Sequence, residues 1–82
     1  MKENAENAFI GGGLENKISA PFSAIGAGVR NIVDAVYSII PGGIDNTIGA
    51  DAEYSFAAGQ MTNIQHSGTF AWSDDDKQLV IL

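Results

Sequence analysis

The chain has no cysteine and only one histidine among its 82 residues. Without cysteine it cannot form disulfides, and one histidine is too few for the cysteine- and histidine-based zinc sites of many small domains. A chain of this length buries only about 60–65% of the surface that its unfolded form exposes. Small scaffolds need disulfides, a metal or association to become stable. Association between copies is therefore the remaining way to stabilise the fold.

Positive charge is also scarce, with four Lys and Arg residues against ten Asp and Glu residues and a net charge of −6. Nucleic-acid binding requires clustered basic residues, so we expect no nucleic-acid partner. No apolar run approaches the roughly 20 residues of a membrane-spanning helix, and the first eight residues lack the apolar core of a secretion signal. We therefore expect no direct membrane insertion, and export directed by sequence outside this chain.

Glycine is abundant, and the glycines mark a repeat of about 15 residues. The last glycine of each block and the apolar residue five positions later keep the same spacing, at Gly13, Gly28, Gly43 and Gly59, and at Ile18, Val33, Ile48 and Ile64. Asparagine precedes that apolar residue by two positions in three blocks, and Thr62 takes its place in the fourth. The fourth block is one residue shorter before its glycine, and the sequence does not place this gap. Self-similarity at a fixed short period is the signature of a stacked repeat architecture.

Each block is too short for a pair of helices. β-Branched and aromatic residues interrupted by glycine indicate short strands and turns. We therefore predict an all-β fold, a parallel β-roll or solenoid of about four 15-residue coils. Residues 1–6 are expected to form a frayed N-terminus, residues 7–66 the repeats, and residues 67–82 a C-terminal capping segment of the same domain. In that segment Phe70 and Trp72 are the bulky residues expected to cover the last open coil, and the apolar run at its end is expected to form a further strand.

Apolar residues occur on both faces of the first strand in each coil. Side chains alternate between the faces of a strand, so Tyr37 and Ile39 point one way while Ser38 and Ile40 point the other. A coil has only one interior, and the second apolar face needs another partner. The pattern therefore predicts that copies of the chain associate, without fixing their number.

Two repeated polar residues could be mistaken for functional sites. The stacked asparagines are Asn16, Asn31 and Asn46, and the recurring serines are Ser23, Ser38 and Ser55. Asparagine tolerates left-handed turns and forms amide ladders in stacked coils, so we interpret this row as structural rather than as a binding row. A nucleophilic serine needs a base within hydrogen-bond reach, and the single His66, expected in a solvated turn, cannot serve three repeats. The serines are therefore expected to be packed hydroxyls.

Two further motifs resemble ligand-binding segments but have simpler explanations. Gly11–Gly13 and Gly26–Gly28 resemble phosphate loops, but no helix follows them and no Gly-Lys-Ser/Thr is present, so we predict turn glycines with positive φ. Asp74–Asp76 could hold calcium, but that ion needs six to eight oxygens around it, and adjacent side chains of an extended segment alternate in direction. We assign no catalytic, metal or cofactor residue and expect a protein that is not an enzyme.

Several segments of the chain carry a recognisable family pattern. Ser55–Gly59 reads Ser-Phe-Ala-Ala-Gly and is followed by Thr62-Asn63-Ile64, and Gly68–Trp72 reads Gly-Thr-Phe-Ala-Trp, with Asp74 close behind. The blocks of the pattern Gly/Ala-Gly-x-x-Asn start at Gly12, Ala27 and Gly42. Over about residues 7–76 the chain resembles the YadA-like head domains of trimeric autotransporter adhesins.

The resemblance implies a left-handed parallel β-roll with three chains side by side. It further implies a rigid head, exposed at a bacterial cell surface, that binds host matrix proteins, other cells or surfaces. No coiled-coil stalk or anchor barrel is present in this sequence, so the resemblance extends to the head alone. The alternative hypothesis is a structural trimerisation module of a phage tail fibre or similar spike, with no adhesive role of its own.

Overall fold

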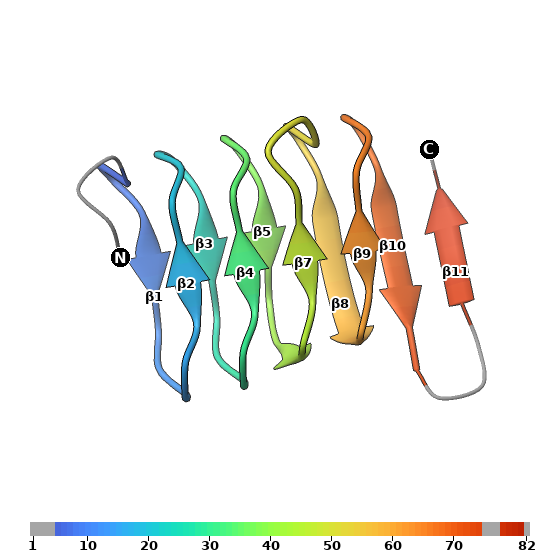
Figure 1. Ribbon diagram of the computed structural model, residues 1–82, viewed down its shortest axis with the longest axis horizontal. Coiled ribbons are helices and arrows are strands. Elements are labelled where there is room, and N and C mark those ends of the chain that lie inside the picture. The colour runs from blue at the N-terminus through green and yellow to red at the C-terminus, as the bar shows by residue number, and fades with distance from the viewer. Residues whose placement is uncertain (1–4, 75–77, 82) are drawn as a thin grey trace.

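The repeats form a β-solenoid of about four turns in the computed structural model, which describes residues 5–74 and 78–81 (Figure 1). All regular elements of the described residues are strands. They are β1 (Phe9–Ile10), β2 (Lys17–Ile18), β3 (Ala24–Ile25), β4 (Ile32–Val33), β5 (Ile39–Ile40), β6 (Gly43–Ile44), β7 (Thr47–Ile48), β8 (Phe56–Gln60), β9 (Asn63–Ile64), β10 (Phe70–Ser73) and β11 (Gln78–Ile81). The predicted all-β solenoid of short strands is confirmed.

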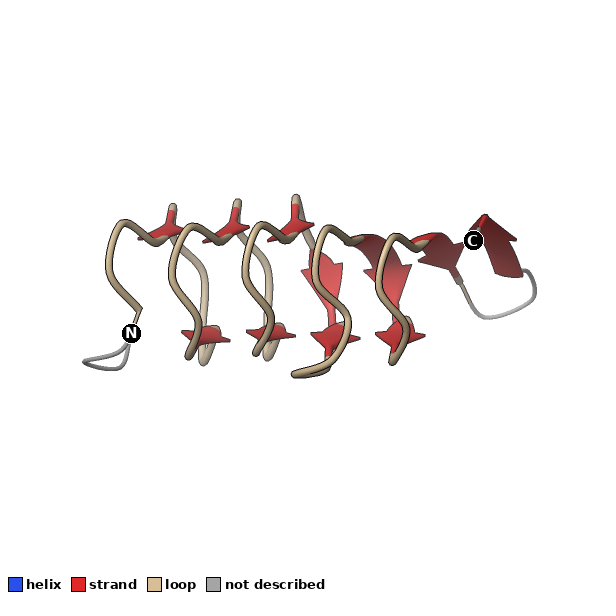
Figure 2. Ribbon diagram, turned by 90° about the horizontal axis from the view of Figure 1, so that it is seen from above, coloured by secondary structure: helices blue, strands red, loops and turns tan. Residues whose placement is uncertain are grey.

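The strands stack into two sheets that form opposite walls of the solenoid (Figure 2). Sheet A has the order β1-β3-β5-β8-β10-β11, with β6 also paired to β8, and sheet B has the order β2-β4-β7-β9. Neighbouring strands are parallel except for the antiparallel pair β10 and β11. Parallel pairing follows from the repeat, because each coil places the same residue over its counterpart in the previous coil.

The core lies between the two sheets and consists mainly of one aliphatic residue per strand. Sheet B contributes the apolar repeat residues, and sheet A faces them with isoleucine in early coils and alanine in later ones. The buried residues of the two sheets are Ile18, Val33, Ile48 and Ile64, and Ile25, Ile40, Ala57 and Ala71. Burying one such isoleucine contributes about 1.5–3 kcal/mol, so the stability of a single copy rests on a narrow column of side chains.

Each coil turns at two corners where the backbone is left-handed. The first corner, just before the strands of sheet A, has positive φ at Asn7, Phe22, Tyr37, Tyr54 and Gly68. The second corner, just before the strands of sheet B, has positive φ at Glu15, Arg30, Asp45 and Met61. The last glycine of each block also has positive φ, as expected, but Gly11, Gly12 and Gly26 do not, so the expectation of positive φ is wrong for these three. The repeat asparagines do not have positive φ either, so the expectation that they are chosen for left-handed turns is wrong; the residue before each of them takes that conformation.

The strand register shows where the fourth block lacks one residue, which the sequence alone did not determine. Phe56 pairs with Ile39, 17 residues earlier, whereas Gly59 pairs with Gly43, 16 residues earlier. One residue of the third coil between Ile39 and Gly43 therefore has no counterpart in the fourth. The two added residues lie at the longer corner between β7 and Tyr54, where the Ala52 N–H donates to the Gly49 carbonyl at 3.0 Å.

Both ends of the repeat array extend beyond the expected boundaries. At the N-terminus, residues 1–4 lie outside the described residues, but Ala5 is buried and the Glu6 carbonyl accepts a hydrogen bond from the Phe22 N–H. Residues 5 and 6 therefore belong to the first coil rather than to a frayed segment. At the C-terminus, β10 pairs with β8 residue for residue and continues sheet A.

The bulky residues of β10 do not cover the open end of the solenoid. Phe70 and Trp72 alternate with the buried Ala71 and Ser73 and lie half-exposed on the outer face of sheet A. The expectation that they close the last coil is therefore wrong. Instead the chain reverses, and β11 adds the antiparallel last strand of sheet A. The predicted strand in the final apolar run is confirmed for Gln78–Ile81.

Candidate functional site: the outer face of sheet A

The outer face of sheet A carries an apolar row along the length of the solenoid. In β5 and the two residues before it, Ser38 and Ile40 are buried while Tyr37 and Ile39 are 54% and 39% exposed, as the alternation predicted. Pairing in register aligns Ile39 with the equivalent outward residues of the other coils. This central row consists of Phe9, Ala24, Ile39, Phe56 and Phe70.

A second row, the aromatic row, consists of Phe22, Tyr37 and Tyr54. It lies along one edge of sheet A, meaning the side where the strands of this sheet begin. Their rings stack with centroids 5.5 Å and 5.3 Å apart and planes within 7° of parallel. All three residues have φ between 54° and 60°, a conformation that costs an L-residue roughly 1–2 kcal/mol. Stacking contributes about 0.5–1.5 kcal/mol per pair, so the two pairs offset part of that strain. All three remain at least half exposed.

A shallow open groove of about 440 Å³ lies between the central row and the aromatic row. Its lining is Asn7, Phe9, Phe22, Ser23, Ala24, Tyr37, Ser38 and Ile39. The hollow arises at Ala24, because this small side chain sits between the larger Phe9 and Ile39 in the central row. The two rows are therefore parts of one continuous, uneven surface.

A third row, the aliphatic row, consists of Leu14, Val29 and Ile44. It lies along the opposite edge of sheet A, on the side where β1, β3 and β5 end. These residues follow the bend at the positive-φ glycines and are joined by parallel bridges from Leu14 to Val29 and from Val29 to Ile44. Leu14 is 60% exposed and Ile44 is 42% exposed. Sheet A is thus bordered on both edges by exposed apolar side chains.

Charge is absent from the strands of sheet A, although the chain as a whole carries a net charge of −6. Most charged residues of the described part of the chain lie at the corners or on sheet B, where Lys17 begins β2, and Asp74 directly follows β10. At the second corner, Arg30 Nε donates to Asp45 Oδ1 at 2.8 Å and a terminal nitrogen of the guanidinium donates to Oδ2 at 3.0 Å. This hydrogen bond and the charge of Arg30 lower the pKa of the exposed Asp45 carboxyl.

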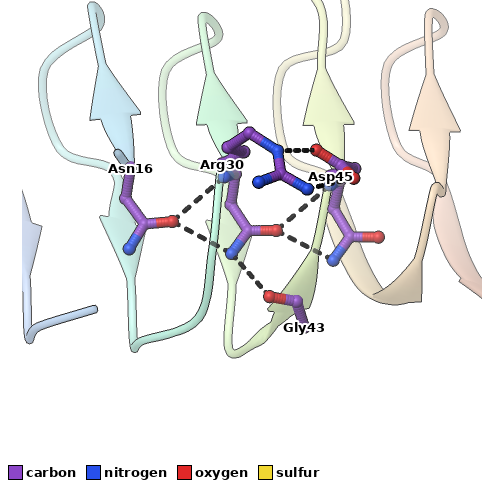
Figure 3. A network of polar contacts seen from close by, with 6 residues as sticks. Asn16, Arg30, Gly43 and Asp45 are labelled. Carbon is purple, nitrogen blue, oxygen red and sulfur yellow. Dashed lines mark hydrogen bonds and ion pairs between the residues drawn. The ribbon is translucent and has the colours of Figure 1, made fainter. Parts of the chain in front are cut away.

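The repeat asparagines form a ladder inside the solenoid beside that ion pair (Figure 3). Asn31 and Asn46 are completely buried, and each asparagine Oδ1 accepts a hydrogen bond from the backbone N–H of the next asparagine slot. Each Nδ2 donates to the glycine carbonyl of the following coil, for example from Asn31 to Gly43 at 3.0 Å. Thr62 ends the ladder by donating its hydroxyl to the Ala58 carbonyl at 2.8 Å. The predicted amide ladder is confirmed.

The repeated serines form a similar buried row. Ser23 Oγ donates to the Ala35 carbonyl at 2.7 Å, and Ser38 Oγ donates to the Ala52 carbonyl at 3.3 Å. Ser55 Oγ donates to the backbone carbonyl of His66 at 3.3 Å. These hydroxyls are engaged in backbone hydrogen bonds between coils, which matches their interpretation as packed residues. The His66 side chain lies exposed at a bend, as expected.

The remaining candidates form no common site. Gly11–Gly13 and Gly26–Gly28 lie in the turns between sheets A and B, one coil apart. In the acidic triplet Asp74–Asp76, Asp74 is exposed, and Asp75 and Asp76 lie outside the described residues. Across residues 5–74 and 78–81, no three histidine or acidic residues cluster closely enough to hold a metal ion. In the same part of the chain no helix could span a membrane.

No family model, curated protein or solved structure matches this chain. The site must therefore be assessed from its own geometry. Sequence reasoning found the outward apolar residues of the first strand, but it missed the aliphatic row at the other edge. The sequence did contain a pattern that predicts the aliphatic row, because the residue after the last glycine of the first three blocks is Leu, Val or Ile. A large, uncharged apolar face of this kind is suited to binding another protein surface.

Proposed function

We propose that this chain is the head of a homotrimeric bacterial surface adhesin, in which three left-handed β-rolls lie side by side with sheet A turned inward. The observation that carries the proposal is the uncharged outer face of sheet A. Like-charged copies with a net charge of −6 repel one another most weakly where they meet through a surface without charge. Burial of the three apolar rows supplies the driving force for association.

The size of this face sets how much surface each contact of the trimer can bury. The molecule measures 36 × 25 × 13 Å, with the longest dimension along the solenoid and the shortest across the two sheets (Figures 1 and 2). The flat outline of the whole molecule on this side is at most 36 × 25 Å, about 900 Å². Each chain of a trimer divides it between two neighbours, so contacts at the corners must add to the roughly 800 Å² per partner of a stable interface. With sheet A inward, sheet B faces outward as the surface available to a host matrix protein or another cell-surface ligand, and the protein acts outside the cell.

The composition of sheet B favours the alternative of a trimerisation module in a fibre or spike. The outward residues of its strands are Lys17, Ile32, Thr47 and Asn63. They include no aromatic residue and no charged cluster, whereas binding hot spots are enriched in Trp, Tyr and Arg. In this alternative the apolar face is fully used for assembly, and the outer sheet has no ligand.

Sedimentation equilibrium of the purified chain tests the shared part of both proposals. We expect a particle of three chains, and a monomer or dimer over the whole concentration range would overturn it. Beads coated with the trimer then separate the two functions: retention on immobilised matrix proteins or on cells supports the adhesin, and retention no greater than that of albumin-coated beads supports the structural module. Turnover of a glycan or ester by the purified protein would overturn both non-enzymatic proposals.

A further inference from the structure

We infer that the two edges of sheet A meet each other between copies, with the aromatic row of one chain packed against the aliphatic row of the next. The inference rests on the proposed trimer and specifies which residues form each of its three contacts. It assigns distinct roles to two rows that lie on the same chain but cannot touch within it. Tyr37 precedes β5 and Ile44 follows the bend after it, so they lie at opposite ends of one coil, separated by seven residues that span at most about 23 Å at about 3.3 Å per residue.

Symmetry requires two different patches in such an assembly. A two-fold contact can use the same patch on both chains, but a closed three-fold ring joins one patch of each chain to a different patch of its neighbour. When three solenoids lie parallel around an axis along their length, the neighbouring edges are opposite edges of sheet A. The aromatic row occupies one of these edges, and the aliphatic row occupies the other.

The two rows match in spacing and direction. The aromatic rings follow one another at 5.5 Å and 5.3 Å. The aliphatic residues are joined by parallel bridges, which place successive residues about 4.8 Å apart. Both rows run along the solenoid with one residue per coil. Each ring of one row can therefore lie against a side chain of the other, and the contact repeats at each coil.

The surroundings of the aliphatic row also suit an interface. Each of its residues is followed directly by a residue at the second corner, and there Arg30 and Asp45 are exposed and paired with each other. An apolar contact bordered by exposed charges corresponds to the buried core and polar rim of ordinary interfaces. Beside the aromatic row, Pro21 and Val36 precede Phe22 and Tyr37, and only Tyr54 directly follows a charged residue, Glu53. Contact of the aliphatic row with its own copy would instead bring two charged corners together.

Cysteine cross-linking tests the arrangement directly because the chain has no cysteine of its own. The double variant Tyr37→Cys/Ile44→Cys is treated with a short bismaleimide and examined on a denaturing gel. We expect a covalent trimer, since each chain is linked to both neighbours, and no cross-linked product from either single variant. The matched control is Tyr37→Cys/Thr47→Cys, whose second cysteine lies on sheet B and is expected to give no product.

The outcomes separate this inference from the proposal beneath it. A monomeric wild type overturns the trimer and the inference together. A trimeric wild type whose double variant remains uncross-linked, or whose Tyr37→Cys variant forms dimers alone, overturns only the pairing of the rows. If the cysteine variants dissociate, a charge pair decides: Tyr37→Asp and Ile44→Lys should each dissociate the trimer, and the two combined should restore it. Failure to restore it counts against the pairing.

Discussion

At the scale of single residues, the asparagine ladder holds the coils in register. Asn31 is completely buried, donates to the Asn16 side chain and the Gly43 carbonyl, and accepts from the backbone and side chain of Asn46. The substitution Asn31→Ala leaves several of these buried groups without partners, each at a cost of about 1–3 kcal/mol. We expect the free energy of unfolding in urea to fall by roughly 3–5 kcal/mol, a large part of the stability of a small domain.

The control for this prediction is Asn63→Ala, which replaces an exposed asparagine on the outer face of sheet B. Its effect should stay within about 0.5 kcal/mol, as for most surface substitutions. Both variants must be measured at one protein concentration, because association changes apparent stability. Equal effects of the two substitutions would mean that the ladder does not stabilise the solenoid.

The Arg30–Asp45 pair is expected to act through the ionisation of Asp45. Because Arg30 lowers the pKa of this carboxyl, the pair stabilises the fold above the usual pKa of aspartate and ceases to do so as the pH falls through the lowered value. The substitution Arg30→Ala should raise the pKa of Asp45 toward its ordinary value. A carbon-detected NMR titration of the carboxyl group measures this, and Lys17→Ala should leave the titration unchanged.

The stability effect of this pair should be small because both side chains are exposed, and exposed ion pairs contribute little in water. It should shrink further at high salt, where screening weakens the attraction. An Asp45 titration that is the same with and without Arg30 would contradict the assignment of the lowered pKa to this contact.

The conformation of Tyr37 shows where residue-level prediction stops. Its outward direction followed from strand alternation, but its positive φ did not, because aromatic residues rarely adopt that region. The cause is tertiary: the coil must turn at this corner, and stacking on Phe22 and Tyr54 offsets part of the strain. No local sequence rule contains that contact between coils.

At the scale of the coil, close approach of neighbouring turns makes one glycine indispensable and leaves another replaceable. A Cβ on Gly28 would lie 2.1 Å from the Gly43 carbonyl oxygen, and Gly28 has a φ of +114°. The substitution Gly28→Ala therefore combines backbone strain with overpacking, and we expect it to cost on the order of 3 kcal/mol or more. Thermal unfolding followed by circular dichroism measures the loss.

Gly12 provides the matched control within the preceding coil. A Cβ there meets no atom within 4 Å, and its φ is not positive. Because alanine restricts the unfolded chain more than glycine does, Gly12→Ala should be neutral or stabilising by about 0.4–1 kcal/mol. If Gly28→Ala unfolds at the same temperature as Gly12→Ala, the coils are not held as closely as the Gly28–Gly43 approach requires.

Most of the coil architecture could be predicted from spacing alone, because parallel stacking keeps equivalent residues one above another. The prediction was weakest where the period breaks. The unmatched residue of the third coil and the longer corner after β7 were placed only by the pairing of Ile39 with Phe56 and of Gly43 with Gly59. The outward direction of Phe70 was also missed, because the sequence does not say whether a changed pattern continues a sheet or closes it.

At the scale of the whole molecule, the two sheets differ in their outward chemistry, and this difference determines how copies meet. Sheet A combines an uncharged surface with three apolar rows, whereas sheet B has lysine and asparagine in its outermost strands. The sequence alone could predict that a second apolar face exists. It also carries the apolar residues Leu14, Val29 and Ile44 of the aliphatic row, but their place beside sheet A depends on the positions of the corners.

Two isoleucines test which sheet lies in the interface, since Ile39 points outward from β5 in sheet A and Ile32 points outward from β4 in sheet B. Both sites accept a solvated lysine in a single copy, because both side chains reach the surface. In the proposed trimer, Ile39→Lys places an unpaired charge in a desolvated contact, which costs several kcal/mol. We expect sedimentation velocity to show monomers for Ile39→Lys and trimers for Ile32→Lys. The reverse result would place sheet B at the centre of the assembly and sheet A on its outside, where its aromatic and central rows would be free to bind a ligand.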